Sequence, residues 1–95
     1  MKAAEAFLPG EYLKDELDAR GWTQSQFARI IGRPIQVVNQ IIHGKKSITP
    51  ATAVAFASAL GTSAEVWMNL EVAYQLSRVK PDPAIARRAN KATAA

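Results

Sequence analysis

The sequence predicts an all-α domain of five helices, of which the second and third form a helix–turn–helix. The stretch from Thr23 to Lys46 contains two short helical patterns separated by the break Gly32-Arg33-Pro34. Thr or Ser precedes three of the predicted helices, and glycine follows four of them. Because Thr and Ser favour helix N-termini and Gly favours the position after a helix, this punctuation predicts the helix boundaries.

The first predicted helix begins at Pro9-Gly10 and ends before Gly21. Proline fixes φ near the start of a helix, and Gly21 has the position of a C-terminal glycine. Its apolar stripe consists of Tyr12, Leu13 and Leu17.

The second predicted helix begins after Thr23 and ends before Gly32. Thr23 and Gln26 have the spacing of a capping box. Gly32 permits a sharp turn, and Pro34 restricts Arg33 to extended geometry before the next helix. The residues expected to face the core are Phe27, Ala28, Ile30 and Ile31.

The third predicted helix runs from Ile35 to about His43. Its β-branched residues are weak helix formers, so we expect tertiary packing to stabilise it. Val38, Ile41 and Ile42 are expected to point inward. The residues expected on the opposite face are Ile35, Gln36, Asn39, Gln40 and His43.

The last two predicted helices follow a loop at residues 44–48. Thr49 and Pro50 begin the fourth helix, which ends at Leu60, and Ser63 caps a fifth helix that reaches about Arg78. The core residues expected from the fourth helix are Val54, Phe56, Ala57 and Leu60. Asp82-Pro83 could cap a short helix through Arg88, but without a strong apolar stripe. We expect a flexible N-terminus at residues 1–8, a domain at residues 9–79 and a basic, flexible tail at residues 80–95.

Composition restricts the class of protein. A chain of 95 residues with 48% apolar residues fits one folded domain. It contains no cysteine and one histidine, which excludes disulfides and argues against a metal site. No apolar run approaches the roughly 20 residues needed to cross a membrane, and no signal-peptide core is present, so we expect a cytoplasmic protein. The sequence contains no recognisable nucleophile–base set and no phosphate-binding glycine loop, so we expect neither an enzyme nor a cofactor.

Charge is unevenly distributed along the chain. Residues 1–20 carry three basic and five acidic residues, whereas residues 21–64 carry four basic residues and no acidic residue. The net charge of +4 therefore gathers on the helix–turn–helix and on the tail. A helix–turn–helix that has amide side chains and lacks carboxylates suits a polyanion that displays base edges. The hypothesis that follows is sequence-specific binding of double-stranded DNA.

The third helix carries the candidate base-reading residues. An Asn or Gln amide can both donate to and accept from adenine in the major groove. We assign this role to Gln36, Asn39 and Gln40, although the same residues would also suit a merely solvated helix face. Ile35 could contact a thymine methyl group or could pack against the second helix.

The candidate phosphate contacts flank that helix. Thr23 and Gln24 stand at the N-terminus of the second helix, where free backbone N–H groups favour an anion. Thr23 could equally serve only as a cap. The remaining candidates are Arg33 in the turn and Lys45, Lys46 and Ser47 in the loop after the third helix.

The fifth predicted helix has more apolar surface than one packing face requires. Trp67, Leu70 and Tyr74 fall on one face, and a second set falls on another face: Met68, Val72, Leu76 and Val79. One face is expected to seal the core and the other to form an interface. We assign the interface between copies to Trp67, Leu70 and Tyr74; alternatively, a small domain buries all of this surface itself.

The order of helices resembles the lambda-repressor-like (XRE) helix–turn–helix family. The segments PGEYLKDELDARGWTQSQFARIIG and ITPATAVAFASALGTSAEVWMNL make the chain similar to HigA-type antitoxins, which are also called virulence-associated or plasmid-maintenance antitoxins. The resemblance covers roughly residues 9–79. It implies an antitoxin that neutralises a RelE-like mRNA-cleaving toxin and represses its own operon as a homodimer. Because a two-fold symmetric protein requires two-fold half-sites, we expect the operator to be palindromic. The alternatives are a stand-alone XRE-type regulator without a toxin, and a protein-interaction module that has lost DNA binding.

Overall fold

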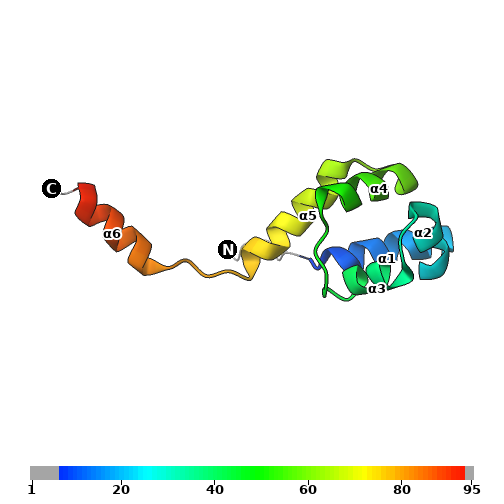
Figure 1. Ribbon diagram of the computed structural model, residues 1–95, viewed down its shortest axis with the longest axis horizontal. Coiled ribbons are helices and arrows are strands. Elements are labelled where there is room, and N and C mark those ends of the chain that lie inside the picture. Colours follow the sequence, from blue (N-terminus) through cyan, green and yellow to red (C-terminus); the bar gives the residue numbers. More distant parts are fainter. Residues whose placement is uncertain (1–6, 94–95) are drawn as a thin grey trace.

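The computed structural model describes residues 7–93, and its regular elements there are all helices (Figure 1). They are α1 (Pro9–Arg20), α2 (Gln24–Ile31), α3 (Ile35–Ile42), α4 (Pro50–Leu60), α5 (Ala64–Ser77) and α6 (Pro83–Thr93). The five predicted helices are confirmed, with ends that differ by about one residue. Of the expected flexible N-terminus at residues 1–8, residues 1–6 lie outside the described part of the chain.

Local punctuation accounts for these boundaries. Gly21 adopts φ 68°, a left-handed conformation that favours glycine, and its N–H closes the end of α1. The predicted capping box of α2 is present, with the Thr23 hydroxyl accepting from the Gln26 N–H and the Gln26 side chain accepting from the Thr23 N–H. The side-chain hydroxyls of Thr49 and Ser63 cap α4 and α5. Each accepts a hydrogen bond from the backbone N–H of the third residue of its helix.

An aromatic cluster forms the centre of the core. Trp67 is fully buried, and its ring centroid lies 5.0 Å from that of Tyr12 and 5.1 Å from that of Phe56. Phe56 in turn lies 5.3 Å from Phe27, so the cluster connects α1, α2, α4 and α5. The other buried apolar residues are Leu13, Leu17, Ala28, Val38, Ile41, Ile42, Ile48, Ala53 and Leu60.

Two residues predicted for the core are exposed. Ile30 is 50% exposed on α2, and Val54 is 57% exposed on α4. Both helices carry apolar residues on more than one face, so periodicity alone does not identify the buried face. In α4 that face belongs to Ala53, Phe56 and Leu60, because these residues meet the aromatic cluster.

The start of α1 packs closely against the end of α3. Gly10 is buried, and a Cβ atom at this position would overlap the backbone carbonyl oxygens of Ile41 and Ile42. Glycine at residue 10 therefore allows α1 to hold the C-terminal end of α3 in place.

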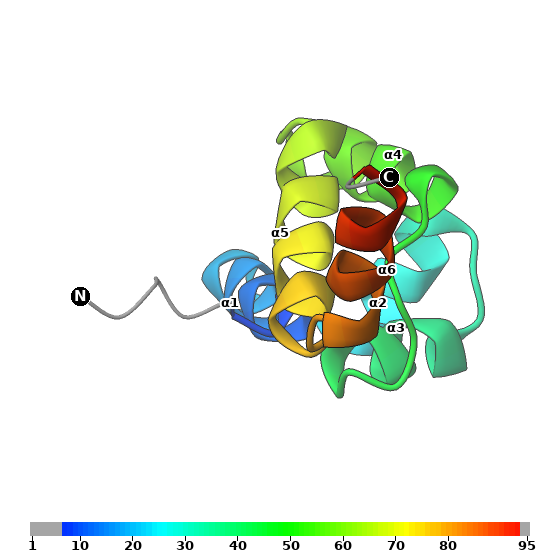
Figure 2. The same cartoon turned by 90° about the vertical axis from the view of Figure 1, so that its left-hand side faces the viewer.

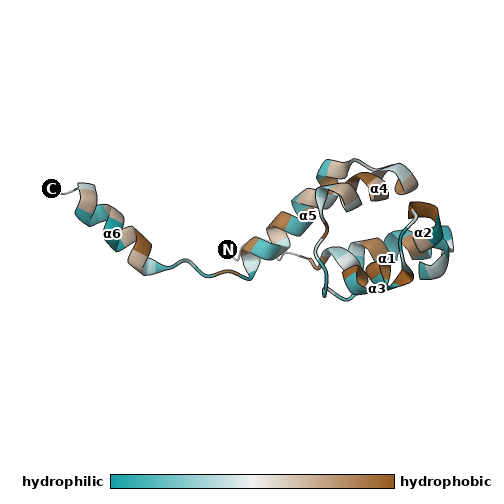
Figure 3. Ribbon diagram, in the orientation of Figure 1, coloured by the Kyte–Doolittle hydropathy of each residue, from teal (hydrophilic) through white to brown (hydrophobic). Residues whose placement is uncertain are grey.

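The tail differs from the prediction. Residues 83–93 form α6, a longer helix than the short one considered through Arg88. The Asp82 side chain accepts a hydrogen bond from the Ala84 N–H at 2.9 Å, which stabilises the helix N-terminus. α6 stands apart from the other helices at one end of the molecule (Figure 1), the end that faces the viewer in Figure 2, and it has no buried residue. Its ribbon is coloured mostly in hydrophilic to intermediate tones, with one hydrophobic segment near its start (Figure 3).

None of the helices within residues 7–93 has both the length and the apolar character needed to span a membrane.

Candidate nucleic-acid interface

The predicted turn joins α2 to α3. Gly32 adopts φ 68°, and the Arg33 N–H donates to the Ala28 carbonyl at 2.9 Å, which closes the end of α2. Pro34 is extended, with φ −61° and ψ 147°, and precedes the first residue of α3. Ala28 is buried, and its small side chain permits close packing of the two helices. The helix–turn–helix predicted from the sequence is therefore confirmed.

The amide residues predicted on α3 lie together on its exposed face. Gln36, Asn39 and Gln40 are exposed, and with two neighbours they line a hollow of about 310 Å³. The neighbours are Ile35, which is 42% exposed, and Gln24 from α2. Ile35 thus lies on the outer surface and not in the core. The hollow combines hydrogen-bonding groups with one apolar contact, the combination that a base edge with a methyl group requires.

Asn39 is held by a contact between the two helices. Its Nδ2 donates to the Gln24 Oε1 at 3.2 Å. This bond leaves the Asn39 side-chain oxygen as its free acceptor and orients Gln24 along the same surface. The structure therefore joins a predicted base-reading residue to a predicted phosphate contact.

The candidate phosphate residues occupy three separate segments of the chain. Thr23 is exposed at the N-terminus of α2, where its hydroxyl already serves the capping box. Arg33 is half-buried, and its Nε is buried without a hydrogen-bond partner within residues 7–93. Its terminal nitrogens are the groups that could meet a phosphate. Lys45, Lys46 and Ser47 are exposed in the loop between α3 and α4.

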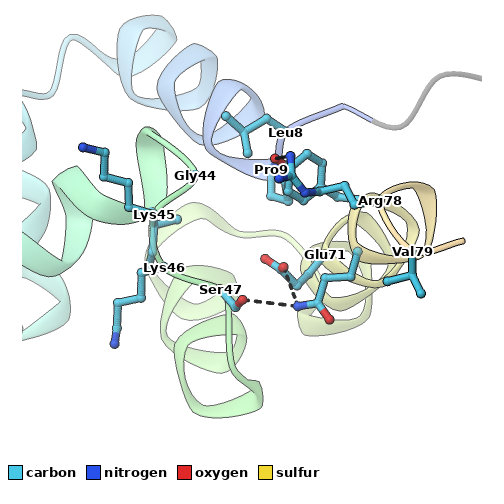
Figure 4. Close-up of a pocket in the computed structure, with 12 residues that line it drawn as sticks. Leu8, Pro9, Gly44, Lys45, Lys46, Ser47, Glu71, Arg78 and Val79 are labelled. Atoms are coloured by element: carbon cyan, nitrogen blue, oxygen red, sulfur yellow. Dashed lines mark hydrogen bonds between the residues drawn. The ribbon is translucent and has the colours of Figure 1, made fainter.

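Glu71 of α5 fixes the loop between α3 and α4. This role was not among the predictions made from the sequence. Its side chain is 5% exposed, and Oε1 accepts from the Ile48 N–H at 2.8 Å. The other oxygen accepts from the Gln75 Nε2 at 2.7 Å, and Gln75 also donates to the Ser47 hydroxyl at 3.2 Å. Figure 4 shows Ser47 and Glu71 turned toward each other, whereas Lys45 and Lys46 extend away from α5. The loop backbone is thus held from inside while its lysines face outward.

One signal in the sequence could have identified Glu71. It lies four residues after Trp67, so the two share a helix face, and an acidic residue on a core stripe requires a buried partner. A groove of about 430 Å³ lies between the loop and α5 beside these residues, and Arg78 lines it together with Leu8 and Pro9 at the start of α1.

Arg20, which directly precedes the acid-free segment 21–64, has a structural role. Its guanidinium donates to the Glu16 carboxylate at 2.7 Å and to the Leu60 carbonyl at 2.8 Å. It therefore stabilises the C-terminal end of α4, where carbonyl groups lack partners within the helix. The acid-free segment itself, residues 21–64, contains four cations: Arg29, Arg33, Lys45 and Lys46.

The assignment of Trp67 to an interface between copies is wrong for this folded chain. Trp67 is fully buried, and its Nε1 donates to the Thr62 hydroxyl at 2.8 Å. Leu70 is half-buried and packs against the core, so this side of α5 faces inward. Tyr74 is half-buried and lines the groove beside the loop. The other apolar set is divided: Val72, Leu76 and Val79 are 49%, 69% and 70% exposed, whereas Met68 is half-buried and packs against the core.

Comparisons with known proteins agree with this geometry. A helix-turn-helix family model matches residues 13–67. The uncharacterized HTH-type transcriptional regulator YddM of Escherichia coli strain K12 is 26% identical over 87 residues, which cover 92% of this chain and 93% of YddM.

Solved structures are also similar. An addiction module antidote protein of the HigA family from Coxiella burnetii has a TM-score of 0.72 and 31% identity, with 82% of this chain and 99% of that chain covered. The Pseudomonas aeruginosa antitoxin HigA, solved with the higBA promoter, has a TM-score of 0.73 and 28% identity, with 92% and 90% covered.

Proposed function

The chain belongs to the helix-turn-helix family, and we propose that it is a sequence-specific DNA-binding antitoxin that represses its own operon. The resemblance to HigA-type antitoxins found in the sequence is confirmed by the structural neighbours from that family. Its family and fold are those of DNA-binding regulators and antitoxins and not of enzymes.

The exposed amide face of α3 is the observation that carries this proposal. Gln36, Asn39 and Gln40 line one hollow on this face. The segment of the chain that contains them, residues 21–64, has no acidic residue. Amides read base edges, and Lys45 and Lys46 next to them supply charge for the phosphate backbone. A carboxylate on this surface would repel DNA, so its absence favours DNA over a protein partner.

Repression of its own operon is supported by the structure of a relative. The Pseudomonas aeruginosa antitoxin HigA was solved with the higBA promoter. A RelE-like mRNA-cleaving toxin as the partner of this chain rests on the family resemblance.

The proposed binding unit is a homodimer on a palindromic operator. A two-fold symmetric dimer would present two α3 helices to half-sites about one helical turn (~34 Å) apart. Because Trp67 is in the core, we assign the contact between copies to an exposed apolar stripe formed by Val72 and Leu76 on α5 and Val79 just beyond its end. Val72 and Leu76 lie at i and i+4 and therefore share one face of α5, and the exposed Val79 follows two residues after the helix ends at Ser77.

A stand-alone transcriptional regulator is the second candidate function. It is favoured by the similarity to YddM, whose name describes a regulator and no toxin partner. Both candidates use the same DNA surface, so DNA binding alone does not separate them.

Two experiments test the proposal. Selection from a pool of random duplexes should return an inverted repeat, and recovery of unrelated sequences would argue against sequence-specific binding. Co-purification from the native host should then yield a small ribonuclease. Expressed alone, that ribonuclease should arrest the growth of the cells, and expression of this chain should relieve the arrest. A chain that selects an inverted repeat but relieves no such arrest would be the stand-alone regulator.

A further inference from the structure

The sixth helix, α6, has one strongly cationic face. Arg87, Arg88 and Lys91 are exposed, and the helix Pro83–Thr93 contains no acidic residue. At 3.6 residues per turn, the three cations fall within about 100° of one another around the helix axis. They line a shallow hollow of about 420 Å³ together with Ala84 and Asn90.

The fold itself makes no use of these three charges. α6 buries no residue and adds nothing to the core cluster. Within residues 7–93 the ion pairs are Lys14–Asp18 and Glu16–Arg20, both on α1, so no described carboxylate neutralises α6.

An isolated helix with this charge pattern is unfavourable. Arg87 and Lys91 lie at i and i+4, where like charges destabilise a helix. An 11-residue helix without a packing partner is also marginal in water. A ligand with closely and regularly spaced negative charges would relieve this repulsion. Double-stranded DNA carries one charge per about 1.7 Å of axis, so several phosphates fit along a helix that is about 16 Å long.

α6 is also well separated from the predicted base-reading surface. The molecule is 60 Å long, and α6 lies at one end of that axis, away from α3 and the other helices of the domain (Figure 1). Phosphates near α6 are therefore different from those near Lys45 and Lys46. A second cationic element at such a distance would extend the length of DNA that is contacted.

We propose that the cationic face of α6 binds backbone phosphates of the same duplex that α3 reads. This inference rests on the proposed DNA-binding function. Phosphate contacts contain little sequence information, so α6 contributes to affinity and not to the choice of operator.

The test is a triple variant of the full chain, Arg87→Ala with Arg88→Ala and Lys91→Ala. The slope of log K against log salt should fall by about 0.9 for each phosphate that the variant no longer neutralises, or about 2.7 for three. Between about 50 and 200 mM salt, wild type should then lose on the order of 40-fold more affinity than the variant. The weakening should be equal on operator and random DNA. Near-ultraviolet circular dichroism of the aromatic cluster should be unchanged.

Three controls make the result specific. Ile85→Ala alters an exposed residue of α6 that lies outside the cationic hollow, and it should leave the slope unchanged. Lys14→Ala removes an exposed charge from α1 and measures the effect of net charge alone. Lys45→Ala with Lys46→Ala should lower the slope by about 0.9 per phosphate and serves as a positive control.

The outcomes separate this inference from the proposed function. If wild type prefers its operator but the triple variant keeps the wild-type slope, α6 does not contact DNA and this inference is overturned. A fall no larger per charge than that of Lys14→Ala would also overturn it, because net charge would then explain the effect. If wild type does not discriminate its operator from random DNA, the proposed function itself fails.

Discussion

At the scale of single residues, we assign the proposed reading of bases to Gln36 and Gln40. Both amides are exposed on α3 and line the same hollow. We expect Gln36→Ala and Gln40→Ala each to weaken operator binding by about 1–3 kcal/mol, because alanine cannot form the bidentate pair with a base edge. Random DNA should be bound almost as before. Fluorescence anisotropy with both duplexes measures the difference.

The matched control for these amides is Asn69→Ala, which removes an exposed amide from α5. It should leave both affinities unchanged. Equal weakening on operator and random DNA from Gln36→Ala would show that this residue does not read bases.

Glu71 decides the position of the loop after α3. Glu71→Ala would leave the Ile48 N–H buried without its acceptor, which costs about 1–3 kcal/mol. We therefore expect the free energy of unfolding in urea to fall by that amount, together with affinity for any DNA that Lys45 and Lys46 contact. Glu65→Ala, at an exposed position on the same helix, should change stability by no more than about 0.5 kcal/mol. Equal effects of the two substitutions would contradict a buried role for Glu71.

At the scale of elements, the close approach of α1 to α3 depends on Gly10. In Gly10→Ala the new Cβ would overlap the carbonyls of Ile41 and Ile42, which are backbone atoms and cannot rotate away. The two helices must then separate, and we expect stability measured by thermal unfolding to fall by about 1–3 kcal/mol. Glu11→Ala, one residue later and exposed, provides the control. Wild-type stability in Gly10→Ala would mean that the two helices can move apart without cost.

The sequence predicts where the helices begin and end more accurately than it predicts which of their residues are buried. The caps Thr23, Thr49 and Ser63 and the glycine after α1 act within one turn of the chain, so their effect was predictable. The exposure of Ile30 and Val54 was not, because each belongs to a helix with apolar residues on several faces. The helix at residues 83–93 was underestimated for a related reason: its apolar stripe is weak, and it has no packing partner in the core.

At the scale of the whole molecule, dimerisation should depend on the exposed stripe of α5. Leu76 is 69% exposed, so Leu76→Glu adds a charge there without disturbing the core. We expect this variant to sediment as a folded monomer and to bind operator DNA weakly, because two half-sites are no longer bound together. Val54→Glu, at a 57% exposed apolar position on α4, should remain a dimer. If Leu76→Glu remains a dimer, the interface between copies lies elsewhere.

The sequence by itself determined the five helices of the domain, the turn between α2 and α3, and the amide face of α3. These features depend on caps, glycines, a proline and a periodicity that operate over a few residues. Only the tertiary structure decided which face of α5 is buried, because both Trp67 and Val72 belong to apolar stripes and the choice depends on where the rings of Tyr12 and Phe56 lie. It also decided the role of Glu71, whose partner Ile48 is 23 residues away and becomes a neighbour only when α5 packs beside the loop.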